Sequence, residues 1–163
     1  MIFDTLFLDR DGVINKKIDG DYVKTIADFE FIEGSVEGIL KLSELFKRII
    51  VVTNQQGIGK GLMTHDQLEK VHDYMNQNLK GKISKIYYCP HLESDRCNCR
   101  KPANGMIKRA LQDFPEIIIN RSFLIGDSES DILAGKSMHI CTVKVDNEFT
   151  LFSWVNQILS AKG

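Results

Sequence analysis

The sequence predicts an α/β protein built on a doubly wound, Rossmann-like parallel sheet with helices on both faces. Short apolar runs of strand length alternate along the chain with amphipathic stretches of helical length, as expected when crossover helices connect parallel strands. Several of the runs are apolar at almost every position, which is typical of strands buried on both faces. The 163 residues are close to the usual size of one domain. We therefore expect a single domain over residues 1–163.

Five segments are predicted to be strands, because each is a short apolar or alternating run bounded by polar residues or glycine. In chain order they are residues 5–9, 48–53, 83–88, 122–125 and 142–145. Residues 89–103 follow the third strand and show neither helical nor strand periodicity, so we expect an irregular loop there.

Five helical stretches separate and follow these strands. Apolar residues recur at helical spacing over 35–46, beginning at Ser35, and over 64–79, where Thr64 is a suitable N-cap. Further helices are expected to open at Asn104 and at Ser128, and the acids after Ser128 suit the positive end of a helix dipole. The stretch 149–159 closes the pattern.

Charge and hydropathy restrict the class of partner. The 21 basic and 22 acidic residues nearly balance, which gives no electrostatic reason to expect nucleic-acid or membrane binding. Apolar runs stay well short of the ~18 residues of a membrane span. The first residues lack a basic start and include Asp4, unlike a secretory signal. We expect a cytoplasmic monomer with reduced cysteines that acts on a small molecule.

Acidic and polar residues follow three of the predicted strands. Asp9 and Asp11 end the first, Thr53 and Asn54 the second, and Asp127 the fourth. In open α/β sheets, ligands bind beyond the carboxyl ends of the strands, so these groups should share one rim. Clustered carboxylates repel one another unless they share a cation, and an oxygen-rich site suits Mg²⁺. The alternative for residues 9–12 alone is a simple Asp-Gly turn, which the coincidence of three strand ends makes less favourable.

Three of the four cysteines lie beside a histidine in the irregular loop. The spacing C-x-H-x5-C-x-C places Cys89, His91, Cys97 and Cys99 within 11 residues. Four such ligands without an open position predict a structural Zn²⁺ site that would position the adjacent Lys101. A reduced surface loop and a local disulfide are the alternatives.

The remaining cysteine and histidines give weaker signals. Cys141 falls in a strand pattern, and we expect it to be a buried apolar filler. His65, His72 and His139 show no partner in the sequence and are expected to be surface or helix residues.

Four motifs in order resemble those of the haloacid dehalogenase superfamily. "LFLDRDGVIN" resembles the DxDGT-type nucleophile motif, with Val13 where Thr is commoner, and "VVTNQQGIGKG" resembles the second motif. "CRKP" and "LIGDSESD" resemble the third and fourth. Together the motifs cover essentially the whole chain, and they coincide with the predicted strand ends.

The resemblance implies a phosphatase and a role for each motif residue. Asp9 would form an aspartyl-phosphate, and Asp11 would serve as general acid and then general base. Mg²⁺ would be held by Asp9, the Asp11 carbonyl and Asp127. Thr53 and Lys101 would bind the phosphoryl oxygens. Asn54 and Gln55 would also contact substrate, and Asp131 is either a support for the metal site or a simple first-turn acid.

The motifs and the cysteine loop together resemble one branch, which contains D-glycero-D-manno-heptose 1,7-bisphosphate 7-phosphatases and histidinol-phosphate phosphatases. This implies no large cap domain and access controlled by loops 15–34 and 55–63. The segments 19–34 and 51–64 favour the heptose bisphosphate, whose distal phosphate Lys60, Arg100 and Lys16 or Lys17 would reach.

Two departures favour histidinol phosphate as the alternative substrate: only five residues separate His91 from Cys97, and Ser128 stands where Lys is often found in heptose enzymes. A nucleic-acid 3′-phosphatase is less favoured because the charge is balanced, and an inactive binding protein because every motif residue is present.

Overall fold

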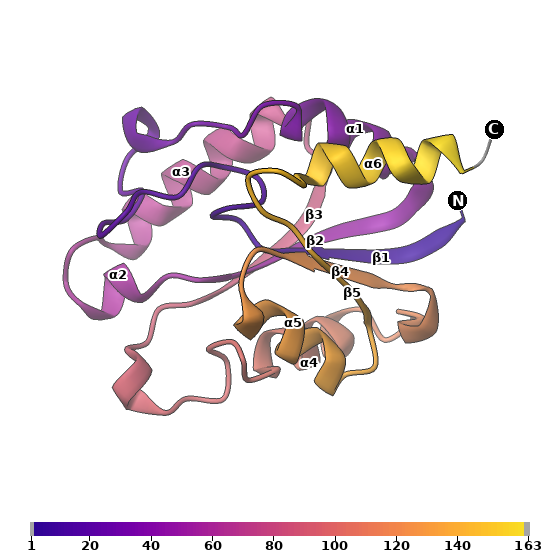
Figure 1. Ribbon diagram of the computed structural model, residues 1–163. Helices are drawn as coiled ribbons and strands as arrows, with labels where there is room; N and C mark the ends of the chain where they lie inside the picture. Colours follow the sequence, from indigo (N-terminus) through magenta and orange to yellow (C-terminus); the bar gives the residue numbers. More distant parts are fainter. Residues whose placement is uncertain (1, 162–163) are drawn as a thin grey trace.

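The computed structural model describes residues 2–161, so residues 1, 162 and 163 of the expected domain lie outside the described part (Figure 1). The strands are β1 Phe3–Leu8, β2 Phe46–Asn54, β3 Ile83–Cys89, β4 Phe123–Gly126 and β5 Cys141–Lys144. The α-helices are α1 Ser35–Leu45, α2 Gln56–Gly59, α3 His65–Asn78, α4 Gly105–Asp113, α5 Glu129–Ser137 and α6 Leu151–Ser160. Short 3-10 turns lie at Ile26–Asp28, Glu93–Asp95 and Ile119–Arg121.

The five strands form one parallel sheet in the order β3-β2-β1-β4-β5. Helices α1, α3 and α6 cover one face, while α4 and α5 cover the other (Figure 1). The predicted doubly wound α/β fold is therefore confirmed. Strand β1 lies at the centre, between β2 and β4, so the order of connection reverses beside it. This is the switch point at which open α/β sheets bind ligands, beyond the carboxyl ends of the strands.

Alternation along the central strands divides the apolar core in two. Leu6 and Leu8 of β1 pack in the cluster beneath α1, α3 and α6, whereas Phe7 packs in the cluster with α4 and α5. Because both faces are covered, Leu6, Phe7 and Leu8 are all fully buried. This explains why the run is apolar at successive positions, and it makes the end of β1 a rigid support.

Two boundaries differ from the prediction around Phe46. The helical pattern was expected to run through residue 46, but α1 ends at Leu45 and β2 begins at Phe46. Phe46 pairs in register with Phe3 of β1, and the two rings stack with centroids 5.0 Å apart. Tertiary pairing thus overrides the local helical periodicity.

The prediction that Cys141 is a buried filler is wrong, because this residue is exposed. It begins β5, which is the edge strand of the sheet and is only partly covered. His72 lies in a helix, as expected for these histidines, but it is buried. Within residues 2–161, none of the helices is both long enough and apolar enough to cross a bilayer.

A buried ion pair lies at the opposite end of the sheet from the acidic rim. Arg48 Nη1 donates to Asp4 Oδ1 at 3.1 Å, and that oxygen also accepts bonds from the Thr5 hydroxyl at 2.8 Å and the Ile118 amide at 3.1 Å. Arg48 also pairs with Glu116, whose side chain is half exposed. The pair joins β1, β2 and the segment before β4 where no ligand is expected, so its role is structural.

We predict that Asp4→Ala lowers the free energy of unfolding by about 3 kcal/mol, because it leaves the buried Arg48 without its inner partner. The matched change Glu116→Gln removes only the half-exposed partner and should cost less than ~1 kcal/mol. Urea unfolding would measure both. Equal losses in the two variants would contradict the assignment, as would a loss of kcat/KM per folded molecule in Asp4→Ala.

Candidate active site

The chain turns sharply after β1 so that acidic side chains can meet. Gly12 has a φ of +84°, and a Cβ atom there would lie 2.1 Å from Asp127 Oδ2. Glycine is therefore required both for the left-handed backbone and for the close approach of Asp127. Gly126, at the end of β4, admits Asp131 in the same way, since a Cβ would lie 2.2 Å from that of Asp131.

Three carboxylates converge at this point. One oxygen from each of Asp9, Asp127 and Asp131 lies within 4.8 Å of the others. Asp127 Oδ2 forms an ion pair with Lys17 Nζ at 2.8 Å. The buried Oδ1 of Asp127 has no hydrogen-bond partner in the part of the chain that the structure describes. Burial raises the pKa of Asp9 to about 7; Lys101 opposes the shift, and the charges of Asp131 and Asp11 add to it. Acids crowded in this way, with an unsatisfied oxygen, are suited to a divalent cation.

Lys101 provides the positive charge at the base of the site. Its Nζ donates to Asp9 Oδ1 at 2.9 Å and to the Val52 carbonyl at 2.8 Å, and it pairs with Asp131 Oδ1 at 2.5 Å. The side chain is almost fully buried. Burial alone would lower the pKa of Lys101, but Asp9 and Asp131 outweigh it and raise the pKa. The ammonium is therefore charged and fixed beside the Asp9 carboxylate.

Asn54 holds the backbone of Lys101 in place. Its Oδ1 accepts from the Lys101 amide at 3.0 Å, and its Nδ2 donates to the Lys101 carbonyl at 3.2 Å. The end of β2 is thereby joined to the loop that carries Lys101. Asn54 also lines the cavity described below, so its predicted contact with substrate stays a prediction.

Asp11 is held by three side-chain donors. Its Oδ1 accepts from Arg10 Nη2 at 2.8 Å and from Asn15 Nδ2 at 2.9 Å, and its Oδ2 accepts from Gln55 Nε2 at 3.0 Å. Gln55 Nε2 also donates to the buried Thr53 hydroxyl at 2.9 Å. Burial raises the pKa of Asp11, but the Arg10 charge and these hydrogen bonds outweigh it, so the pKa is lowered. Gln55 thus links the second motif to Asp11.

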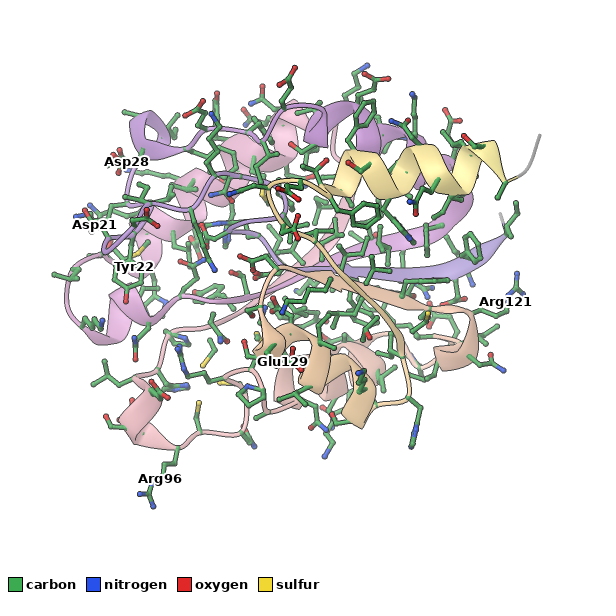
Figure 2. All side chains as sticks on the ribbon, viewed as in Figure 1. Asp21, Tyr22, Asp28, Arg96, Arg121 and Glu129 are labelled. Atoms are coloured by element: carbon green, nitrogen blue, oxygen red, sulfur yellow. The ribbon has the colours of Figure 1, made fainter. Side chains whose placement is uncertain are left out.

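A cavity of about 300 Å³ opens over these groups. Asp9, Asp11, Lys101 and Asp127 contribute to its lining, together with Arg100 and Tyr22. Arg100 Nη1 is buried and, among the residues described, has no hydrogen-bond partner. Figure 2 shows Asp21 and Tyr22 on the 15–34 loop, while Arg96, at the tip of the cysteine loop, points away from the molecule. The loops expected to control access therefore do contribute to the wall.

The other basic residues that were expected to reach a distal phosphate differ in whether they line the cavity. Lys60 is exposed and is not among the residues that line the cavity, although its Nζ lies 5.4 Å from the centre of the ring of Tyr22, which does line it. A hydrogen bond from Lys60 lowers the pKa of Tyr22; burial opposes this, and the charge of Arg100 adds to the lowering. Lys17 lines the cavity, whereas Lys16 pairs with Glu30 at 2.5 Å on the surface.

The four predicted zinc ligands form one cluster. Cys99 Sγ lies 3.0 Å from Cys89 Sγ and 3.2 Å from His91 Nδ1. Cys97 Sγ lies 3.5 Å from Cys89 Sγ and 3.6 Å from Cys99 Sγ. All four cysteines of the chain are free, and these separations exceed the ~2.05 Å of a disulfide. They approach the ~3.8 Å that Zn–S bonds of ~2.3 Å give in a tetrahedral site.

The three thiols of this cluster differ in the direction of their pKa shifts. Partial burial raises the pKa of Cys97, but backbone amide bonds from Arg100 and Cys99 outweigh it and lower the pKa to about 6. Burial raises the pKa of Cys89 and of Cys99. A thiolate at neutral pH is the form that binds zinc. The same contact connects Cys97 to the residue before Lys101, so the cluster and the phosphate-facing lysine share one short loop.

A parallel sheet that presents acids and a buried lysine beyond its central strands is the arrangement of hydrolases of the haloacid dehalogenase superfamily. The model of the family described as Polynucleotide kinase 3 phosphatase matches residues 3–153. The chain belongs to this family of phosphatases and is a phosphomonoester hydrolase.

Curated relatives agree with this assignment, and a solved structure shares the fold. A D-glycero-beta-D-manno-heptose-1,7-bisphosphate 7-phosphatase of Pasteurella multocida is 39% identical over 144 residues, covering 83% of this chain and 77% of the relative. A D-glycero-alpha-D-manno-heptose-1,7-bisphosphate 7-phosphatase of Campylobacter jejuni is 43% identical over 150 residues, covering 88% and 82%. The D,D-heptose 1.7-bisphosphate phosphatase from B. bronchiseptica, complexed with magnesium and phosphate, has a TM-score of 0.81 at 24% identity, covering 97% and 99%.

Several residues of the site carried little or no signal in the sequence. Tyr22 lies in the 15–34 loop that was expected to control access, but nothing in the sequence indicates that this residue of the loop lines the cavity. The sequence leaves Asp131 open between a support for the metal site and a first-turn acid, because its ion pair with Lys101 depends on the tertiary fold. The contact of Arg10 with His72 joins the turn after β1 to α3 and is likewise visible only in three dimensions.

We predict that Gly12→Ala lowers kcat/KM at least about tenfold and destabilises the fold by ~1–3 kcal/mol, because the new methyl group displaces Asp127 and the backbone is strained. Gly20→Ala is the matched control: its φ is also positive, at +70°, but a Cβ there meets nothing within 4 Å. Phosphate-release kinetics and thermal unfolding measure both effects. Equal kcat/KM in the two variants would refute the requirement for space at Gly12.

Proposed function

We propose that the chain removes the 7-phosphate of D-glycero-D-manno-heptose 1,7-bisphosphate. The observation that carries this choice is the buried, unpartnered Nη1 of Arg100, which lies in the lining of the same cavity as Asp9. A substrate with a second phosphate would supply the missing acceptor, and guanidinium groups suit that anion. The names of the relatives at about 40% identity favour the same substrate.

We further propose that Mg²⁺ is held by the carboxylates of Asp9 and Asp127 and by the backbone carbonyl of Asp11. The unpartnered Oδ1 of Asp127 and the convergence of the acids support this assignment. When bound, the ion would offset the negative charge of the phosphoryl oxygens and of the acids around them. The magnesium and phosphate of the B. bronchiseptica protein are in keeping with this choice.

In the first half of the proposed reaction, an Asp9 oxygen attacks phosphorus while the bond from phosphorus to the sugar oxygen breaks. The leaving alkoxide takes its proton from Asp11. A phosphate dianion beside Asp11 raises the lowered pKa of that group and so favours the protonated form. Lys101, held against Asp9, stabilises the charge that develops on the phosphoryl oxygens. Thr53, whose hydroxyl accepts from Gln55 Nε2, is fully buried beside the cavity lining, and we propose that it donates its proton to a phosphoryl oxygen.

In the second half, Asp11 takes a proton from water, and the water oxygen attacks phosphorus. The bond from phosphorus to Asp9 breaks, which releases phosphate and restores the carboxylate. The water proton taken by Asp11 replaces the one given to the sugar, so the acid is ready for another cycle. One carboxylate forms the covalent bond and the other moves protons, which accounts for two acids one residue apart.

We propose Zn²⁺ at Cys89, His91, Cys97 and Cys99 as a structural ion. The described cluster has four ligands and no spare position, and it lies in the loop that ends at Lys101. Free thiols are also compatible with the reducing cytoplasm, which we propose as the location of the protein. We also propose that the protein is a monomer.

Histidinol phosphate is the second candidate, favoured by the short spacing between His91 and Cys97. We predict that steady-state phosphate release with Mg²⁺ gives a kcat/KM at least ~100-fold higher for the heptose bisphosphate than for L-histidinol phosphate, because only the bisphosphate has a second phosphate that can accept a hydrogen bond from Arg100. Both anomers should be assayed, along with an oligonucleotide 3′-phosphate. A preference for either of the other two substrates would overturn the proposed substrate and leave the chemistry unchanged.

The proposed zinc site leads to a separate prediction about the cysteine cluster. Cys97→Ser should lose bound zinc and at least about tenfold in kcat/KM, because the loop no longer places Lys101. Cys141→Ser removes the exposed cysteine of β5 and should retain both properties. Metal content by mass spectrometry and kinetics at saturating Mg²⁺ test the pair. Wild-type protein purified without zinc, yet fully active, would refute the proposal.

A further inference from the structure

Arg10 lies between the two acids of the first motif and is completely buried. Alternation along β1 continues past its end: Leu6 and Leu8 face the core beneath α3, and Arg10 extends to the same side. Asp9 faces the other way, toward Lys101. A cationic side chain is thus enclosed where an apolar one would ordinarily fill the core.

The guanidinium has few partners for a buried charge. Nη2 donates to Asp11 Oδ1 at 2.8 Å, and this is its one ion pair among residues 2–161. Nη1 contacts His72 Nε2 at 3.1 Å, and Nε has no hydrogen-bond partner within the same span. His72 therefore supplies the one bond that holds the end of the guanidinium opposite Asp11.

His72 is suited to this task because it is neutral. It lies on the buried face of α3, with 6% of its surface exposed. Guanidinium nitrogens only donate, so Nε2 must accept and the ring proton must be on Nδ1. Burial, aided by the charge of Arg10, lowers the pKa of His72 to about 3. The imidazole is thus a permanent acceptor at neutral pH.

Stability alone is a weak reason for this arrangement. Replacing a buried ion pair by packed apolar side chains is often neutral or stabilising. The contact between Arg10 and His72 does, however, hold in place one of the three donors that orient the Asp11 carboxylate. Without His72, two of the three guanidinium nitrogens would lack acceptors, and the group would turn to satisfy them at the expense of Asp11.

We propose that His72 is a positioning residue for the general acid Asp11, acting through the guanidinium of Arg10. The imidazole sets the plane of the guanidinium, and Nη2 then holds the Asp11 carboxylate where it delivers a proton to the leaving alkoxide. This inference rests on the acid role given to Asp11 in the proposed function.

Leaving-group dependence tests the inference. Protonation matters for a sugar alkoxide but little for p-nitrophenolate, which leaves without a proton. In His72→Leu, kcat/KM should fall about tenfold for the heptose bisphosphate and less than about twofold for p-nitrophenyl phosphate. The ratio of kcat/KM for the heptose bisphosphate to kcat/KM for p-nitrophenyl phosphate, measured on one preparation, does not depend on the folded fraction. A loss from misfolding or from a misplaced Asp9 would instead lower both values equally.

Three further variants complete the design. His72→Gln keeps an acceptor at the position of Nε2 and should restore the ratio to within about twofold of wild type. His65→Leu removes the other histidine of α3, whose Nδ1 lies 2.8 Å from the Tyr88 hydroxyl, and should leave the ratio unchanged. If His72→Leu does not fold, His72→Asn, whose amide is too short to reach Nη1, replaces it and should lower the ratio in the same way.

Asp11→Asn separates the inference from the proposed function. If Asp11→Asn lowers the ratio and the His72 variants do not, the positioning role is overturned and the acid role of Asp11 stands. If Asp11→Asn leaves the ratio at its wild-type value, the acid role itself fails, and the inference fails with it.

Discussion

The ammonium of Lys101, enclosed between Asp9 and Asp131, is the interaction on which the rest of the site depends. A charge removed from water requires close ionic partners, and both carboxylates lie within 2.9 Å of Nζ. The requirement works in both directions, since Asp9 is buried and its charge needs Lys101. Strand β1, the cysteine loop and helix α5 are therefore joined at one point. If any of them moved, a buried charge would be left without its partner.

The fold was largely predictable because its signals are local. The apolar run before Asp9 and the N-cap at Thr64, whose side chain accepts from the Gln67 amide, both depend on neighbouring residues, and both are found in the structure. The exceptions have tertiary causes. Phe46 joins β2 because it stacks on Phe3, and Cys141 is exposed because its strand lies at the edge of the sheet, which a single strand pattern does not reveal.

The candidate site was predictable in its parts and less so in its connections. The motif residues Asp9, Asp11, Lys101 and Asp127 do meet in one cavity, because parallel strands bring their carboxyl ends to one rim. Their supports were not evident, since the Asn54 clamp on Lys101 and the Gln55 bridge to Asp11 join positions that only the tertiary structure brings together. Sequence spacing thus indicates which groups take part, while packing determines how each one is held.

The separation of the partners along the chain has a consequence for biosynthesis. Lys101 and Asp9 are 92 residues apart, and Asp131 is more distant still. During translation the apolar β1 is made long before the lysine that neutralises the acid at its end. A nascent chain that has not reached Lys101 holds the Asp9 carboxylate without its counter-charge, and a carboxylate in that state stays hydrated rather than buried. We therefore expect the two halves of the sheet to pack together late in folding. The phosphate site and the hydrophobic core would then be completed in the same event.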